Sequence, residues 1–333
     1  MVLTRFLHPD RGRRLAVAGL FLFAGAVAAQ DNAAPAALTL SRRFQLSGFA
    51  HAAYTWWEDG IDTFSIKRAR LSLAGEIAKN VKMKFQVDLT KSPLLLEASV
   101  DVVFKPSLGF RFGQFYVPFG REGRTTTAEI ETVQRSQVVE KLAPGRDNGA
   151  SGRDIGVQIF GKVSVFEYMA GAFNGAGINK TDNNERKDFS ARIAAQPTGF
   201  LSLGASLYDG RANPAASGPL VVRNRTGVDA ALTLKDFLLK AEYLHGRDGD
   251  SSRDGWYVQG SYYALPKKLQ ALAKWDSYDP DRETASDRSD ILILGLNWWL
   301  TERTRLQANY LTYFRESSGI VNRALVLQFQ AGF

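Results

Sequence analysis

Eight basic side chains give the clearest chemical signal in this sequence of 333 residues. Five of them alternate with other residues along segments 64–90 and 108–117, and three lie in the long polar stretch 118–151. Guanidinium groups donate paired hydrogen bonds to phosphate-like oxygens, and rings of Arg or Lys attract anions in narrow spaces. We therefore expect an anion-binding track. Its candidate residues are Arg68, Arg70, Lys82, Lys84, Arg111, Arg121, Arg124 and Arg135.

Acidic residues on the same strand faces leave a second interpretation open. They could form ion pairs with the bases and stiffen a wall instead of leaving a track of free positive charge. Segment 118–151 itself has as many acidic as basic residues. The acidic residues expected on the strands are Glu76, Asp88, Glu97, Asp101, Asp154, Asp188, Asp229, Glu242 and Asp276.

Other kinds of chemistry have weaker support. Downstream of residue 29 the chain has only His51 and His245, and no serine shares a supporting strand face with either, so we expect no catalytic residues. Aspartates at 248–254 and 276–281 have spacings that Ca²⁺ can use, but solvated loop carboxylates are the favoured interpretation. We therefore expect no metal and no cofactor. Lys and Arg are dispersed through the chain, which argues against a nucleic-acid partner.

The elements that must position the basic residues are β-strands. Apolar and polar residues alternate with a period of two in about sixteen segments. No helical pattern of convincing length remains to cover the apolar faces, which favours lipid as their neighbour. The expected strands are 43–55, 63–77, 80–90, 94–105, 108–117, 152–161, 164–174, 186–196, 199–208, 224–235, 237–246, 255–264, 268–277, 288–299, 303–314 and 322–333.

Short and long connections tend to alternate between these strands. That pattern is typical of a transmembrane antiparallel β-barrel with tight turns at one mouth and longer loops at the other. Residues 118–151 are the third external loop and the longest, and we expect them to fold into the lumen and narrow it. The other long connections are expected at 175–185, 210–223, 247–254, 278–287 and 315–320.

The two ends of the chain indicate export. Residues 1–29 have the basic start, apolar run and small residues of a signal peptide, and 30–42 are expected to form a short periplasmic leader before a barrel over 43–333. The chain has no Cys, so disulfides cannot stabilise it. The last strand ends on Phe333, which resembles the terminal pattern of outer-membrane barrels.

Several segments resemble signature segments of the phosphate-selective porin O and P family. The match is most specific within 64–122 and is only topological beyond about residue 196. The resemblance implies a sixteen-stranded, trimeric outer-membrane porin whose third external loop enters the lumen and whose Arg and Lys side chains attract phosphate-like anions. The segments that carry it are 64–75, 111–122, 154–158, 173–175 and 188–192.

We therefore expect a porin of the bacterial outer membrane that lets small anionic solutes such as phosphate diffuse passively. Expected partners are those solutes, outer-membrane lipid and lipopolysaccharide, and further copies of the chain in a homotrimer. Small residues at Gly48, Ala50 and Ala52 suggest that the outward face of the first strand is the subunit interface. Two alternatives remain: a barrel enzyme that hydrolyses lipids or esters, and a structural or adhesion barrel without a conducting pore.

Overall fold

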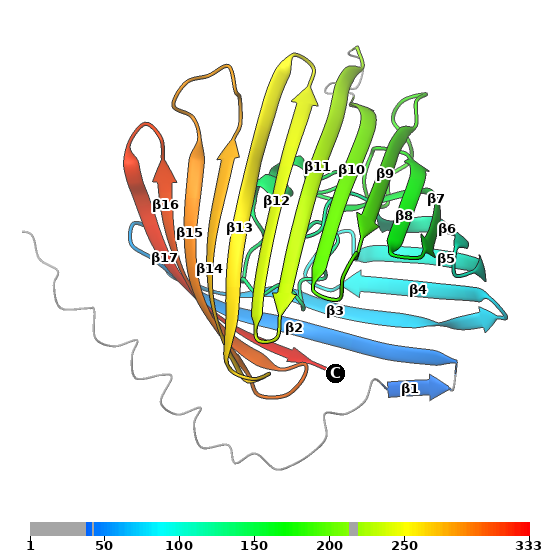
Figure 1. The fold of residues 1–333 in the computed structure, drawn as a ribbon, viewed down its shortest axis with the longest axis horizontal. Coiled ribbons are helices and arrows are strands. Elements are labelled where there is room, and N and C mark those ends of the chain that lie inside the picture. Colours follow the sequence, from blue (N-terminus) through cyan, green and yellow to red (C-terminus); the bar gives the residue numbers. More distant parts are fainter. Residues whose placement is uncertain (1–37, 42, 213–218) are drawn as a thin grey trace, which may run out of the picture. The chain divides into compact units, whose positions relative to one another are not determined.

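Sixteen antiparallel strands form a closed barrel in the computed structural model, which describes residues 38–41, 43–212 and 219–333 (Figure 1). The last strand pairs with the first, with Leu327 opposite Tyr54 and Phe329 opposite Ala52. Closure gives every strand two neighbours, which is how a sheet satisfies its backbone hydrogen bonds in lipid. The strands are β2 (Phe44–Trp57), β3 (Thr63–Ala78), β4 (Val81–Asp88), β5 (Leu95–Lys105), β6 (Leu108–Tyr116), β7 (Arg153–Val163), β8 (Phe166–Phe173), β9 (Asp188–Ala195), β10 (Leu201–Ala212), β11 (Val221–Leu234), β12 (Phe237–Asp248), β13 (Ser251–Leu265), β14 (Leu269–Asp279), β15 (Ser289–Trp299), β16 (Arg305–Arg315) and β17 (Gly319–Gly332).

The alternation of residue types in the sequence becomes the two faces of the wall. In β14, Gln270, Lys274 and Asp276 are buried, whereas Trp275 between them is exposed on the other face. The polar residues of this face point into the barrel and the apolar ones point out, as the period of two predicts. The expected barrel of about sixteen strands is thereby confirmed.

Two elements were not expected from the sequence. Strand β1 (Leu38–Ser41) pairs with residues 44–46 of β2, along the stretch that β17 leaves uncovered (Figure 1). Helix α1 (Gln137–Leu142) lies within the long connection between β6 and β7. The expected leader, 30–42, therefore ends in a short strand, and the expected signal peptide, 1–29, lies outside the described residues.

Two of the expected long loops are short. β12 and β13 are joined through residues 249–250, and β16 and β17 through 316–318. Polar residues at these sites continue the ladder, as with His245 opposite Asp254 and Arg247 opposite Ser252. The sequence-based boundary was wrong because polarity marks where the apolar band ends, whereas hydrogen-bonded strands continue beyond it. Of the loop expected at 210–223, residues 213–218 lie outside the described part.

The barrel has two distinct ends. We call the turn end the mouth with connections such as 79–80, 106–107 and 164–165, and the loop end the opposite mouth. The backbone of Phe333, at the turn end, exchanges hydrogen bonds of 3.0 and 3.3 Å with Gly48. Within the described residues, no helix has the length and apolar character needed to cross a membrane.

Close backbone approach at Gly156 provides a test of this strand packing. A Cβ added to Gly156 would lie 2.2 Å from the carbonyl oxygen of Ala172, whereas one added to Gly260 in β13 would meet nothing closer than 3.9 Å. We expect Gly156→Ala to destabilise the barrel by ~1–3 kcal/mol, as overpacking does, and Gly260→Ala to be neutral or stabilising. Urea unfolding in detergent micelles measures both, and equal stabilities would contradict the close approach.

Candidate functional site

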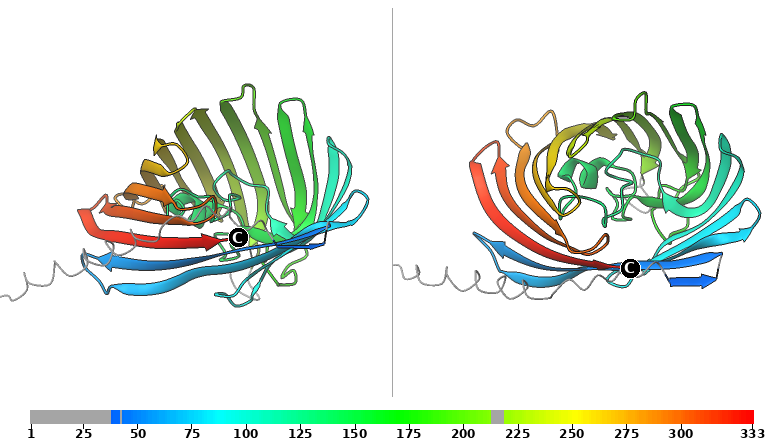
Figure 2. Two further views of the ribbon diagram at one scale, coloured as in Figure 1. Left: turned by 90° about the horizontal axis from the view of Figure 1, so that it is seen from below. Right: turned by 60° about the horizontal axis from the view of Figure 1, so that its bottom comes forward.

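Residues 118–151, here called the inner segment, lie inside the ring of strands (Figure 2). Carboxylates of the wall accept hydrogen bonds from the backbone of this segment. The backbone N–H groups of Arg121 and Glu122 donate to the two oxygens of Glu242, at 2.9 and 3.0 Å. The N–H of Gln137, at the start of α1, donates to Asp276 Oδ2 at 2.6 Å. The wall thus satisfies backbone groups that have no strand partner.

Side chains from further strands hold the carbonyl groups of the inner segment. Arg305 Nη2 donates to the carbonyl oxygens of Ala128 and Ile130, at 2.9 and 2.7 Å. Arg225 Nε donates to the carbonyl oxygen of Leu142 at 3.0 Å. These anchors come from β11 and β16, so the segment is held from several sides of the barrel.

Helix α1 also has an apolar anchor. Its residues Val138, Val139 and Leu142 are completely buried in one cluster with Phe119 of the inner segment and with wall residues such as Leu244. A hydrophobic cluster inside a polar lumen removes apolar surface from water and fixes the helix against β12 to β14. The inner segment is therefore a packed part of the structure.

A buried ion pair also links the inner segment to the wall. Lys274 Nζ lies 2.8 Å from Glu122 Oε2, and both side chains are almost completely buried. Glu122 Oε1 also accepts the N–H of Ser136 at 2.6 Å. Burial by itself raises the pKa of Glu122, but the charge and hydrogen bond of Lys274 outweigh it, and the pKa falls to about 2. Glu122 therefore stays ionised.

Three of the five basic strand residues singled out in the sequence are in ion pairs. Arg70 Nε lies 2.9 Å from Asp88, Lys84 Nζ lies 3.0 Å from Glu97, and Arg111 makes two bonds of 2.6 Å to Asp101. No ion pair of Arg68 or Lys82 occurs among the described residues. The wall therefore has both ion-paired and unpaired bases. The ion-pair interpretation holds for the first group, and the second group keeps free positive charge as an anion track requires.

The three bases of the inner segment have different surroundings. Arg121 Nε bonds to Asp229 at 2.8 Å, and Arg135 donates to the carbonyl oxygens of Glu122 and Thr125. Arg124 has no ion pair or side-chain hydrogen bond with any residue that the structure describes. The eight residues do not form one cluster, because Lys82, Lys84 and Arg111 line one cavity at the turn end and Arg121 and Arg124 line another.

Three further bases lie in or beside the inner segment and were not among the eight. Arg153 has its guanidinium 3.7 Å from the centre of the Tyr116 ring and 3.2 Å from Glu97. Arg146 bonds to Glu140 at 3.1 Å, and Lys91 Nζ donates to Ser151 Oγ at 2.7 Å. Arg153 begins β7 directly opposite Tyr116 in the ladder, a pairing that depends on the register between strands and not on any one segment of the sequence.

We call six of these bases the basic patch. The positive charges of its members repel one another. The pKa of Lys91, for example, is lowered first by burial and then by the positive charges of Arg70 and Arg68. The pKa of Arg135 falls to about 9, first because of burial and then because of Arg146. Acids within ion-pair distance are fewer than bases, since Arg135 and Arg146 share Glu140. The basic patch consists of Arg68, Arg70, Lys91, Arg135, Arg146 and Arg153.

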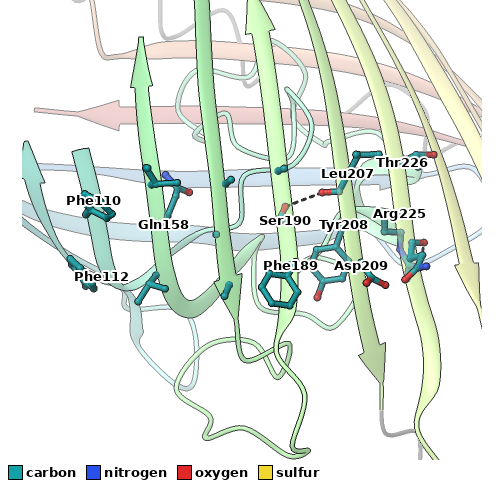
Figure 3. Close-up of a pocket in the computed structure, with 17 residues that line it drawn as sticks. Phe110, Phe112, Gln158, Phe189, Ser190, Leu207, Tyr208, Asp209, Arg225 and Thr226 are labelled. Atoms are coloured by element: carbon teal, nitrogen blue, oxygen red, sulfur yellow. Dashed lines mark hydrogen bonds between the residues drawn. The ribbon is translucent and has the colours of Figure 1, made fainter. Parts of the chain in front are cut away.

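One concavity lies on the outer face of the wall. It has a volume of about 930 Å³ and lies across β6 to β11, where Phe112, Phe189 and Leu207 are exposed (Figure 3). These apolar side chains belong to the outward face of the strands, so the groove is part of the surface that faces lipid. Within the described residues no group of His, Asp and Glu has the arrangement of a metal site.

Comparisons with known proteins agree with this geometry. A family model described as phosphate-selective porin O and P matches residues 57–221. No curated protein matches the chain. The fold is similar to an anion-selective porin from Comamonas acidovorans, with a TM-score of 0.66 and 15% identity over 87% of this chain and 99% of that one.

Two further structures have the same fold. The outer membrane channel DcaP of Acinetobacter baumannii has a TM-score of 0.64 and 14% identity, with coverage of 87% of this chain and 97% of that chain. In-vitro folded OmpT of Vibrio cholerae, in a trimer form, has a TM-score of 0.60 and 15% identity, with coverage of 87% and 99%. The TM-scores of these three structures establish likeness of fold.

The buried pair of Lys274 and Glu122 yields a stability prediction. Lys274→Met leaves a buried carboxylate without its partner, so we expect a loss of ~3–5 kcal/mol in unfolding free energy. Adding Glu122→Gln to Lys274→Met removes the orphaned charge and should recover much of that loss. Urea unfolding of the two variants in micelles measures both values, and equal stability would contradict the role of the pair.

The same pair predicts a dependence on pH. Because folding lowers the pKa of Glu122 from 4.5 to about 2, its contribution is fully present above pH 4.5 and is lost as pH falls toward 2. The difference in unfolding free energy between the natural protein and Glu122→Gln should therefore shrink over that interval. A difference that stays constant down to pH 2 would exclude an ionised Glu122.

Proposed function

We propose that this chain, a bacterial outer-membrane porin of the phosphate-selective porin O and P family, passes small anions in preference to cations. The observation that carries the proposal is the basic patch beside the inner segment, where bases outnumber the acids that pair with them. A narrow lumen with low-dielectric walls focuses the field of such charges, so a local excess outweighs a wall that is balanced on average.

The inner segment is the constriction in this proposal, and its anchors support that role. Hydrogen bonds and an apolar cluster hold it against the wall, and we expect the solute path to run past Arg68, Lys91 and Glu140. In the same proposal the turn end faces the periplasm, residues 1–29 are a signal peptide removed on export, and residues 43–333 are the membrane domain.

Phosphate-like oxyanions are the solute class that fits the patch best. Guanidinium groups supply paired donors that match two oxygens of one phosphate, whereas chloride uses only the charge. The family description names phosphate, and the Comamonas protein is described as an anion-selective porin. Both support an anionic solute for this chain.

Absence of enzymatic activity stays a prediction. His51, one of the two candidate histidines, is buried, and its Nε2 lies 3.0 Å from the side-chain oxygen of Gln330. An amide partner does not activate a histidine as a general base, which gives a lipid or ester hydrolase no support at this position.

A homotrimer is a further part of the proposal, with its interface on β2. Ala50 and Ala52 are exposed on the outward face, and Ala50 lies opposite Ala331 in the ladder. Gly48 does not add to this open surface, because a Cβ there would lie within 3.0 Å of Leu71 and Phe333. Lipid and lipopolysaccharide would cover the remaining outer face, including the groove over β6 to β11.

Ion selectivity provides the direct test of the channel. In a KCl gradient across a planar bilayer, the reversal potential should show that anions are favoured, and Arg68→Glu should lower the anion-to-cation permeability ratio several-fold. Arg68 is the better target than Arg70 or Arg111, because those two are ion-paired with Asp88 and Asp101, whereas no ion pair of Arg68 occurs among the described residues.

Lys79→Glu provides the matched control, since it makes the same change of charge in an exposed turn at the turn end. It should leave the permeability ratio close to that of the natural protein. A natural pore that favours K⁺, or equal effects of Arg68→Glu and Lys79→Glu, would contradict anion selection at the basic patch.

A large side chain in place of Ala50 tests the proposed subunit interface. Ala50→Trp places a large ring where close approach requires a small residue, so we expect the trimer to dissociate at a lower detergent concentration. Val157→Trp, on the exposed outer face of β7, is the control and should leave the oligomer unchanged. Light scattering in mild detergent measures the mass, and a monomer in the natural protein would contradict the trimer.

A further inference from the structure

The groove over β6 to β11 has a floor of small side chains between larger apolar ones (Figure 3). The small side chains belong to β8 and β9, and the flanking ones come from β7, β9 and β10 in two neighbouring rows of the ladder. The floor consists of Ala170, Ala172 and Ala191. The side chains that flank these alanines in the ladder are Val157, Ile159, Phe189 and Leu207.

The size of the groove suits a fatty acyl chain. Its volume is about 930 Å³. A water occupies about 30 Å³ and a methylene group takes up similar space, so the groove has room for at least one whole chain. In a membrane such a chain gains no hydrophobic free energy, because its surroundings are already apolar. What it gains is close packing against a concave surface, which a flat barrel wall does not offer.

Both rows of the groove continue into polar side chains that also point outward. One row passes from Leu207 to Thr226 and then to a histidine, and the other passes from Phe189 to an aspartate, an asparagine and an arginine. Asn224 Oδ1 accepts a bond of 3.3 Å from a backbone N–H, but its amide nitrogen and the hydroxyl of Thr226 donate to no residue that the structure describes. In ladder order the polar residues are Thr226 and His245 in the first row, and Asp209, Asn224 and Arg247 in the second.

Arg247 gives this polar end an accessible positive charge. Its side chain is 60% exposed, and its ion pair with Asp250 is long, at 4.0 Å. Its Nε donates to the carbonyl oxygen of Gly249 at 3.0 Å, which leaves the terminal nitrogens for phosphate oxygens. The nearby negative charge of Asp209 is offset by Arg211, at 3.2 Å.

The position of the groove indicates which lipid it meets. The pair Asp209 and Asn224 lies three pairs from the loop-end limit of the β10–β11 ladder, at Ala212 and Val221. With the turn end toward the periplasm, the groove lies in the outer leaflet and its polar end is close to the headgroups. Strand β10 is eight strands from β2 in either direction around the barrel, so the proposed trimer leaves the groove open to lipid.

We propose that the groove holds an acyl chain of one lipopolysaccharide molecule, whose phosphorylated sugar headgroup contacts Thr226, Asn224 and Arg247. A sugar offers hydroxyl groups to the amide and hydroxyl side chains, and its phosphate accepts paired bonds from the guanidinium. The proposal rests on the proposed function, which places the loop end outside the cell. It deepens that function by assigning one fixed lipid site to an outer face that lipid otherwise covers without a defined position.

Binding of bisphosphorylated lipid A tests the groove. The full mature protein is purified in dodecyl maltoside and stripped of lipid, lipid A is titrated in, and native mass spectrometry counts the molecules bound per chain. We expect saturable binding of one molecule. Ala191→Trp fills the floor and should weaken the apparent affinity about tenfold. Ala273→Trp makes the same change at an exposed alanine of β14 outside the groove, and it should leave the affinity within about twofold of the natural value.

The headgroup contact has its own test. Arg247→Gln should weaken binding of bisphosphorylated lipid A several-fold but leave binding of the dephosphorylated form unchanged, because only the phosphate uses the guanidinium. Arg288→Gln is the matched control, since it removes another exposed guanidinium at the loop end. Phosphatidylglycerol, which has a phosphate but no sugar, should bind more weakly than lipid A.

Three results would overturn the site: equal effects of Ala191→Trp and Ala273→Trp, binding that does not saturate, or phosphatidylglycerol that binds as tightly as lipid A. Light scattering should show the same oligomer for Ala191→Trp as for the natural protein, and a smaller oligomer would assign the groove to a second copy of the chain instead. The reversal potential in a KCl gradient separates these outcomes from the proposed function. The groove lies outside the lumen, so Ala191→Trp should keep the ion preference of the natural pore.

Discussion

The position of the inner segment depends on one constraint: its backbone lies inside a barrel whose strand backbones already use their N–H and C=O groups to pair with neighbouring strands. Every strand already pairs on both sides, so the wall can hold the segment only through side chains. Glu242 and Asp276 accept its N–H groups, while Arg305 and Arg225 donate to its carbonyl groups. Polar side chains that point inward therefore act as substitutes for a missing strand partner.

This use of side chains changes the electrostatic balance of the lumen. By count, the inward faces carry similar numbers of acids and bases. Several carboxylates accept hydrogen bonds from backbone N–H groups. Others, such as Asp229 and Glu140, are shared between two bases. The bases that keep a free charge, such as Arg68 and Arg124, then decide the local sign. A balanced composition thus produces two separate regions with excess positive charge.

The strands and their faces were predictable because they depend on local alternation. A period of two fixes which residues point inward, and this placed Arg70, Lys84 and Arg111 in the lumen. Their partners depend on the register between strands, which no single segment encodes; the ladder sets Arg111 opposite Asp101. The same limit explains why Arg153 was missed and why the eight bases were expected in one track. Helix α1 is only six residues long, and tertiary contacts define it more than its sequence does.

The buried ion pair of Lys274 and Glu122 is better explained by how it positions the inner segment than by a gain in unfolding free energy. An apolar pair of similar size in place of Lys274 and Glu122 would avoid the cost of removing two charges from water, and such exchanges often stabilise proteins. An apolar pair, however, has no preferred direction and would leave the N–H of Ser136 without its acceptor. The ion pair therefore fixes the segment at one depth and one rotation. Because the free bases lie on or beside this segment, that fixed position sets where the positive field is concentrated.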